Sequence, residues 1–279
     1  LKDIKKLLNQ RYEKYKKKVI FIGYKNFNKK IINFLDKSKW NVQKIGDTKI
    51  YYSKEAKIEI LDNKINIVSK RNSKVIFTGG TLENVKVNYS NEKPLTSKNF
   101  SNLNGCINFY DIRLIKIKID IKDSFCEDSI NFVRVQGDID EINSYNSFSD
   151  GIDFDFSNLR VRKIIVKKSK NDCLDFSFGN YILEYVEVYN CGDKAFSIGE
   201  NSKVKINKAY SSNSNINIAV KDKSNVYIND MTSKEANYCV AMYRKKSEFI
   251  GSKLNISNLN CENQDILIDP GNLFSKNDF

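Results

Sequence analysis

The sequence predicts a mainly β protein, a right-handed parallel β-helix with 22-residue coils and a small N-terminal helix and strand cap. Apolar residues recur at intervals of 22 in two columns, and a second strand-like segment follows within each repeat. Both columns have the same parity, so they should face one side of a strand. Units this short bury an apolar side only by stacking on their neighbours. The columns are Ile130, Ile152, Leu174, Phe196, Ile218 and Val240, and Phe132, Phe154, Phe176, Ile198, Val220 and Met242.

Two other folds fit the pattern less well. A leucine-rich repeat has a similar period, but its LxxLxL and asparagine pattern is missing here. An antiparallel sandwich has no need of columns at a fixed interval of 22. The repeat therefore favours a stack of parallel coils.

The chain divides into a basic N-terminal cap, 1–66, and a β-helix, 67–279. Within the cap, 1–18 is expected to form an amphipathic helix, 19–24 a buried strand and 27–37 a short helix. The strands KIYY, KIEIL, KINIV and KVIF follow, and the polar stretch 91–104 is expected to be a loop. We predict that the cap covers the strand edge that an open β-helix would expose.

Composition excludes several classes of protein. With 41% hydrophobic and 12% aromatic residues the chain is globular, and no apolar run approaches the ~18 residues of a membrane span. No signal-peptide core is present near Leu1, but a leader or further domain upstream is left open because the chain does not begin with methionine. The glycine spacing of a nucleotide site is missing, so no nucleotide is expected. A secreted or cell-surface location is favoured over the cytoplasm.

The net charge of +13 lies in the N-terminal quarter. Residues 1–74 carry 21 Lys and Arg against 7 Asp and Glu, whereas the rest of the chain has a net charge of −1. This segment could face phosphate, an acidic glycan or a partner protein. Solvated lysines that reflect a coding bias are the favoured alternative.

The six cysteines allow two interpretations. There is no CxxC pair and no histidine, so zinc ligation is not expected. Reduced cysteines, packed as small buried residues, are favoured over a disulfide framework.

Aspartates gather on three successive repeats and form the candidate site. Stacked carboxylates raise one another's pKa and are costly unless a proton or cation is shared, so their presence needs a physical account. Four accounts are open: glycoside hydrolysis, calcium binding, salt bridges to Lys170, Lys194 or Arg134, and turn capping. The acids are Asp150, Asp153, Asp155, Asp172 and Asp175, flanked by Glu127 and Asp128.

From about 105 to 261 the coils resemble right-handed β-helices of the pectin-lyase-like group. This group contains mainly polysaccharide lyases, glycoside hydrolases, epimerases, adhesins and phage tailspikes. SDGIDFDF, NDCLDFS and GDKAFSIGENSKVKI also resemble uncharacterised β-helix units found beside spore-coat H kinase-like domains.

The resemblance to polygalacturonase-like hydrolases is partial. Their signature has Asn-Thr-Asp-Gly, then an Asp pair one coil on, then Gly-His-Gly. Asp150 and Asp172 match, but Asn171 replaces the first acid of the pair, Asp193 replaces the histidine, and no Arg-Ile-Lys segment follows. These departures put that hydrolase mechanism in doubt.

We expect a polysaccharide-binding or polysaccharide-modifying protein, and the sequence does not decide whether it is an enzyme. If it is one, it is expected to be a glycoside hydrolase or a polysaccharide lyase. Asp150, Asp172 and Asp175 are the catalytic candidates. The expected substrate-binding residues are Asp153, Asp155, Lys170, Lys194 and Arg244. No cofactor is required, although Asp153, Asp155 and Asp175 could hold calcium. The other hypothesis is a non-enzymatic scaffold or surface module whose basic N-terminal segment contacts a partner.

Overall fold

The computed structural model describes residues 40–70, 73–92 and 104–276, and this part of the chain contains strands and no helix. The strands are β1 Trp40–Ile45, β2 Thr48–Ser53, β3 Lys57–Leu61, β4 Lys64–Ser69, β5 Val75–Thr78, β6 Thr81–Glu83, β7 Lys86–Asn91, β8 Gly105–Tyr110, β9 Arg113–Ser124, β10 Asp128–Val133, β11 Gln136–Ser147, β12 Asp150–Ser169, β13 Leu174–Cys191, β14 Lys194–Gly199, β15 Lys203–Lys221, β16 Asn225–Tyr243, β17 Lys253–Cys261, β18 Ile266–Ile268 and β19 Leu273–Lys276. None of the described residues forms a helix that could cross a membrane.

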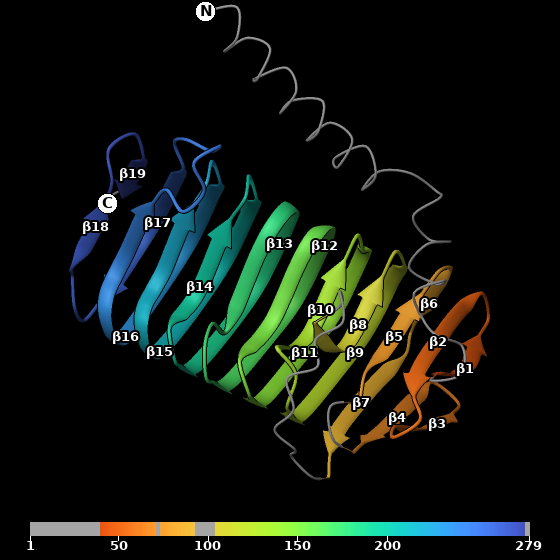
Figure 1. The fold of residues 1–279 in the computed structure, drawn as a ribbon. Coiled ribbons are helices and arrows are strands. Elements are labelled where there is room, and N and C mark those ends of the chain that lie inside the picture. The colour runs from red at the N-terminus through yellow and green to blue at the C-terminus, as the bar shows by residue number, and fades with distance from the viewer. Residues whose placement is uncertain (1–39, 71–72, 93–103, 277–279) are drawn as a thin grey trace, which may run out of the picture. The chain divides into compact units, whose positions relative to one another are not determined.

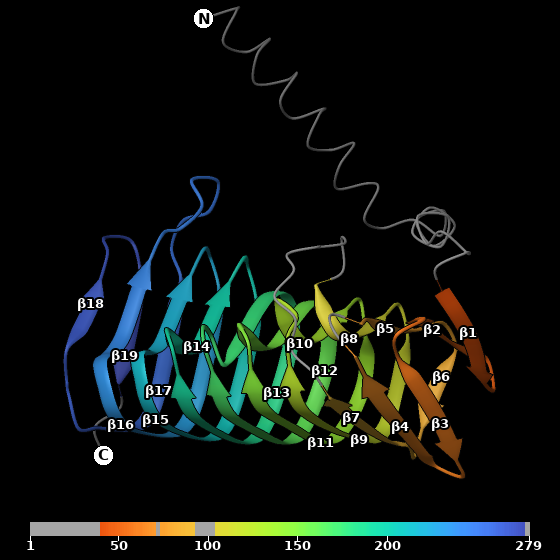
Figure 2. The same ribbon diagram turned by 60° about the horizontal axis from the view of Figure 1, so that its bottom comes forward.

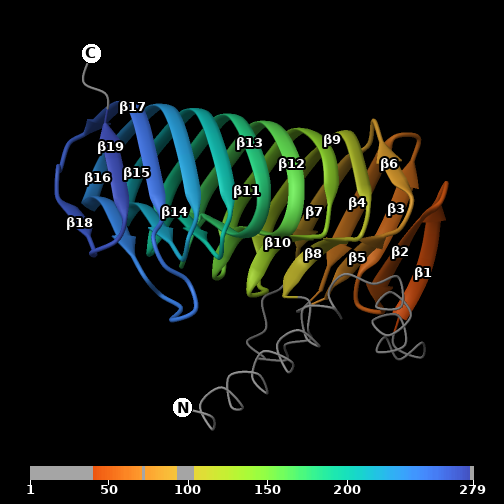
Figure 3. The same ribbon diagram turned by 90° about the horizontal axis from the view of Figure 1, so that it is seen from above.

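Successive coils stack in parallel, as predicted. About nine coils of roughly 22 residues form the β-helix (Figure 1). Each strand segment pairs with its equivalent in the next coil, for example Asp128 with Asp150, and Ile152 with Leu174. Seen from above, the long strands β9, β11, β12, β13, β15, β16 and β17 lie side by side along the stack (Figure 3).

The two predicted apolar columns form the core. All twelve of their residues are fully buried. Phenylalanines extend one column toward the N-terminus: Phe77, Phe109, Phe132, Phe154 and Phe176 stack with ring centroids 4.8–5.1 Å apart. Because identical side chains stack at the strand spacing, the repeat fixes both the inward face and the register.

A single left-handed residue bends each coil at one corner. Asn146, Asn190 and Asn213 have φ between 56° and 59°, a region that asparagine tolerates better than most side chains. Their amides also bond across coils, as in the 2.8 Å contact from Asn213 Nδ2 to Asn190 Oδ1. The polar corners therefore connect successive coils outside the apolar core.

The N-terminal strands depart from the parallel pattern. β3 and β4 form an antiparallel hairpin, and β2 pairs antiparallel with β5, whereas β4 already pairs in parallel with β7 (Figure 2). The four strands predicted from KIYY to KVIF are therefore confirmed. The predicted helices at 1–18 and 27–37, the strand at 19–24 and most of the loop at 91–104 lie outside the described residues.

All six cysteines form disulfides, so the expectation of reduced cysteines is wrong. The pairs are Cys106–Cys126, Cys173–Cys191 and Cys239–Cys261. In the pairing register, Cys106, Cys173 and Cys239 occupy one column, three coils apart.

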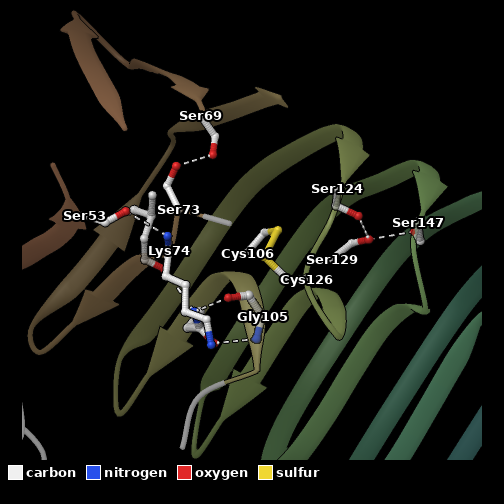
Figure 4. Close-up of a disulfide and its surroundings, with 12 residues drawn as sticks. Ser53, Ser69, Ser73, Lys74, Gly105, Cys106, Ser124, Cys126, Ser129 and Ser147 are labelled. Carbon is white, nitrogen blue, oxygen red and sulfur yellow. Dashed lines mark hydrogen bonds between the residues drawn. A yellow bond between two sulfur atoms is a disulfide. The ribbon is translucent and has the colours of Figure 1, made fainter. Parts of the chain in front are cut away.

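Serine occupies the same corner in an intervening coil. Figure 4 shows Cys106–Cys126 beside the hydroxyl of Ser129, which lies between Ser124 and Ser147. A buried serine group thus fills a position that cysteine pairs take in other coils. The sequence interpretation failed because the disulfide partners have separations of 18, 20 and 22 residues and so follow no fixed interval.

Candidate functional site

The predicted aspartates lie together on one outer face of β10, β12 and β13. We call Asp128, Asp150, Asp153, Asp155, Asp172 and Asp175 the acidic face. Direct register neighbours are Asp128 with Asp150, and Asp153 with Asp175, one coil apart at the usual ~4.8 Å. Strand alternation points Asp153, Asp155 and Asp175 outward, while Ile152 and Phe154 point into the core. Asp128, Asp150 and Asp172 lie where each strand begins or just before it.

Asp150 and Asp172 cap the turns of the coils that follow them. Asp150 Oδ1 accepts hydrogen bonds from the Asp172 backbone N–H at 2.9 Å and from Asn171 Nδ2 at 2.6 Å. One coil on, Asp172 Oδ1 accepts the backbone N–H of Lys194 at 3.0 Å. Turn capping is therefore an established role of both acids. In each carboxyl it engages Oδ1 and leaves Oδ2 outside these bonds.

Asn131 holds the next pair of acids together. Its Nδ2 lies 2.8 Å from Asp153 Oδ2 and 3.5 Å from Asp155 Oδ2, while its buried Oδ1 has no hydrogen-bond partner. Asp175 accepts no hydrogen bond from any described residue and is partly exposed. Of the outward acids, Asp175 is therefore the one whose carboxylate is most available to a ligand.

Burial is the main cause of the raised pKa values of the carboxyls on the acidic face. Burial and the charge of Asp172 raise the pKa of Asp150 to about 6. Burial also raises the pKa of Asp155 to about 6, with the charge of Asp175 acting in the same direction. The pKa values of Asp128 and Asp153 are raised well above the ordinary value, by burial first and then by neighbouring carboxyls.

Lysines border the acidic face at its C-terminal side. Lys194 pairs with Asp172 at 3.3 Å and with Asp193. Burial raises the pKa of Asp193, but hydrogen bonds from Lys194 and Asn215 outweigh it and leave the pKa below the ordinary value. In the register, Lys194 and not Asp193 continues the column of Asp128, Asp150 and Asp172.

A buried lysine lies farther along the same face. Lys221 is 3% exposed, and its Nζ donates to Ser197 Oγ at 2.8 Å. Burial raises the pKa of Asp172, and the charges of Lys194 and, to a smaller extent, Lys221 act against that rise.

The loop after β16 folds back toward this side. Lys246 forms a 2.7 Å ion pair with Glu200, and Ser177 donates to the other oxygen of Glu200. The backbone N–H groups of Lys245 and Lys246 both donate to Asp222 Oδ1 at 2.8 Å. The contacts of this loop with Glu200 and Asp222 could not be predicted from the sequence, because the residues lie far apart in the chain and belong to no repeated column.

Lys170, Arg134 and Arg244 are the remaining residues that the sequence predicted to pair with the acids or to bind substrate. The Nζ of Lys170 lies 4.6 Å from the ring centroid of Phe148, and Arg134 contacts Asp111 and Tyr110. No hydrogen bond or ion pair among the described residues joins Arg244 to the acidic face. Among the predicted salt-bridge partners, Lys194 forms an ion pair with the clustered acid Asp172, and the backbone N–H of Arg134 donates to the backbone carbonyl of Asp155 at 3.0 Å.

Calcium binding by Asp153, Asp155 and Asp175 stays a prediction from the sequence. Across the described ranges, no group of three or more His, Cys, Asp or Glu side chains is arranged to hold a metal ion. Two of the three acids share Asn131 as a hydrogen-bond donor.

Comparison with known proteins gives no relative. No family model, curated protein or solved structure matches the chain. The strand pairing alone identifies the fold as a parallel β-helix. The comparisons do not assign the chain to the pectin-lyase-like group or to the spore-coat units.

Proposed function

We propose that this chain is a polysaccharide-binding and polysaccharide-modifying β-helix protein whose glycan site is the acidic face. The observation that carries the proposal is the raised pKa of Asp150, about 6, one coil away from Asp175, whose side chain accepts no hydrogen bond from any described residue. A carboxyl that holds its proton to a higher pH than usual, with a second carboxyl nearby, is the arrangement that glycoside hydrolysis requires.

The roles follow from exposure and hydrogen bonding. Asp150 and Asp175 are partly exposed, whereas Asp172 is 5% exposed. Asp150 is held by its Oδ1 and would protonate the glycosidic oxygen through Oδ2. Asp175 would activate water as the general base. Asp172 would position Asp150 and the Lys194 side chain.

Inversion of configuration is the proposed outcome. Asp150 and Asp175 are separated by one coil and by three residues along the strand, because Asp153 and not Asp150 aligns with Asp175, and this wider separation leaves room for a water molecule between the two carboxyls. A directly stacked pair at ~4.8 Å would be closer to the 5–5.5 Å of retaining enzymes. Lys194 and Lys221 border the site and would favour a substrate that carries anionic groups.

The test is a screen of acidic polysaccharides for new reducing ends, using the whole chain and three variants. Asp150→Asn and Asp175→Asn keep the size and an acceptor oxygen but remove the charge, and each should abolish turnover. Asp138→Asn, an exposed acid on a different strand segment, is the matched control and should leave turnover unchanged. Turnover of the natural chain should fall as the pH rises through about 6, because Asp150 then loses the proton that it donates.

A non-enzymatic scaffold is the second candidate, and one observation favours it. Asp150 and Asp172 each accept a backbone N–H bond that caps the turn of the next coil, so the same structural role recurs in successive coils. If the face is structural only, no polysaccharide will be cleaved. The double variant Asp150→Asn with Asp172→Asn will then fold as well as the natural chain or better.

A further inference from the structure

A second outer face carries lysine and tyrosine in alternation. Lys122, Tyr145, Lys167 and Tyr189 are direct register neighbours on β9, β11, β12 and β13, and we call them the lysine–tyrosine stripe. Each lysine Nζ lies over the next ring, 5.9 Å from the centroid of Tyr145 and 5.5 Å from that of Tyr189. The stripe belongs to a different strand segment of each coil from the acidic face, close to the ends of these long strands.

A groove continues the stripe toward the N-terminal coils. It has a volume of about 620 Å³ and is lined by both polar and apolar side chains of β4, β7, β9 and β11. Asn88 Nδ2 donates to Asn66 Oδ1 at 2.8 Å, and Lys86 pairs with Asp120 at 2.7 Å. Lys122 and Tyr145 line the groove as well, so the stripe and the groove are one continuous surface. This volume lies within the usual range of ligand sites, 300–1,000 Å³.

The spacing of the positive charges matches a polymer. Lys122 and Lys167 are two coils apart, or ~9.6 Å at the strand spacing. This is close to the repeat of two pyranose residues in an extended chain. The rings of Tyr145 and Tyr189 alternate with the charges and offer apolar surfaces to sugar rings. The next residue of the column after Tyr189 is Ser212. Glu187, on the same strand as Tyr189, accepts hydrogen bonds from Tyr185 and Tyr189.

An acid in the groove favours sugar over nucleic acid. Burial raises the pKa of Asp120, but hydrogen bonds from Lys86 and Asn143 outweigh it and leave the pKa below the ordinary value. The ionised carboxylate accepts hydrogen bonds from sugar hydroxyl groups. It also repels a phosphate on every residue more than an anionic group on every second residue, because the latter can lie over the lysines and away from Asp120. The asparagine amides add donors and acceptors of the kind that sugar hydroxyls need.

We propose that the lysine–tyrosine stripe and its groove bind a linear polysaccharide that carries an anionic group on alternate sugar residues. This site is independent of the acidic face and of any turnover there. It would hold a polymer along the axis of the coil stack.

The test measures binding of four probes to the whole chain by isothermal titration calorimetry. The probes are a hyaluronan octasaccharide with a carboxylate on alternate residues, an oligogalacturonate with one on every residue, a neutral cello-oligosaccharide and an oligothymidylate of matched length. The variant is Lys122→Ala with Tyr145→Ala. The matched control is Lys205→Ala with Tyr227→Ala, which removes the same two side chains from adjacent coils on another face.

Hyaluronan should bind more tightly than the other three probes. The stripe variant should weaken its binding roughly tenfold or more, while the control changes it by less than about twofold. Thermal melting of both variants checks that they fold. The proposal is overturned if hyaluronan shows no binding, if the control loses as much as the stripe variant, or if oligothymidylate binds as tightly. Activity measurements on the acidic-face variants are separate, so either proposal can fail alone.

Discussion

Removing the central disulfide should lower stability by an amount that the structure allows us to estimate. Cys173 and Cys191 close a loop of 18 residues in the middle of the coil stack. The chain-entropy model gives about 3 kcal/mol for a loop of this length. We therefore choose the variant Cys173→Ser with Cys191→Ser as the perturbation.

Serine is the appropriate replacement because this corner already accepts it. In a nearby coil, Ser129 donates to Ser147 Oγ at 2.7 Å, and both side chains are buried. A serine pair at the disulfide position should form a similar hydrogen bond, worth about 1 kcal/mol. The net loss should be about 2 kcal/mol, which corresponds to a melting temperature lower by roughly 4–8 °C.

Circular dichroism during thermal and urea unfolding measures the loss. The natural chain in reductant should lose more than the variant does, because it loses three disulfides and gains no serine pair. Peptide mapping without reductant should find the three pairs. Free thiols in the natural chain, or a variant as stable as the natural chain, would refute the pairing. Disulfides that persist in the protein isolated from its source would also support a secreted or surface location.

Two further predictions concern the core and the pH dependence of stability. Leu174 is fully buried, so Leu174→Asp should cost several kcal/mol and leave little folded protein, as solubility and circular dichroism would show. Because the folded-state pKa values of Asp150 and Asp155 lie above the unfolded value, their contribution is complete below about pH 4 and is lost as the pH rises to about 6. For each of these two carboxyls, the difference between the folded and unfolded pKa corresponds to at most about 3 kcal/mol of the free energy of unfolding. Asp155→Asn should therefore reduce the fall in melting temperature between pH 4 and 6. A melting temperature that rises across this interval would contradict the assignment. The lowered pKa values of Asp193 and Glu200 act in the opposite direction, below about pH 4.

The position of the acidic face was predictable, and its chemistry was not. The interval of 22 placed Asp153 beside Asp175 and put both outside, because strand parity and register follow from the apolar columns. The capping of coil turns by Asp150 was one of four open accounts, since it depends on where the next backbone N–H lies. The sequence analysis did not find the lysine–tyrosine stripe, because a column in which lysine and tyrosine alternate does not stand out when successive repeats are compared.

The sequence by itself determined the architecture, the inward columns and the strands of the N-terminal part. A fixed interval of apolar residues admits one stacking register, because a slip of one residue would turn the column of Phe154 to solvent. The tertiary structure decided which cysteines meet, which acids keep a proton and where lysines reach them. These depend on corners and loops whose lengths vary from coil to coil, and on burial by the neighbouring coils. A repeat interval records neither, so the pKa of Asp150 and the partner of Cys173 follow only from the folded stack.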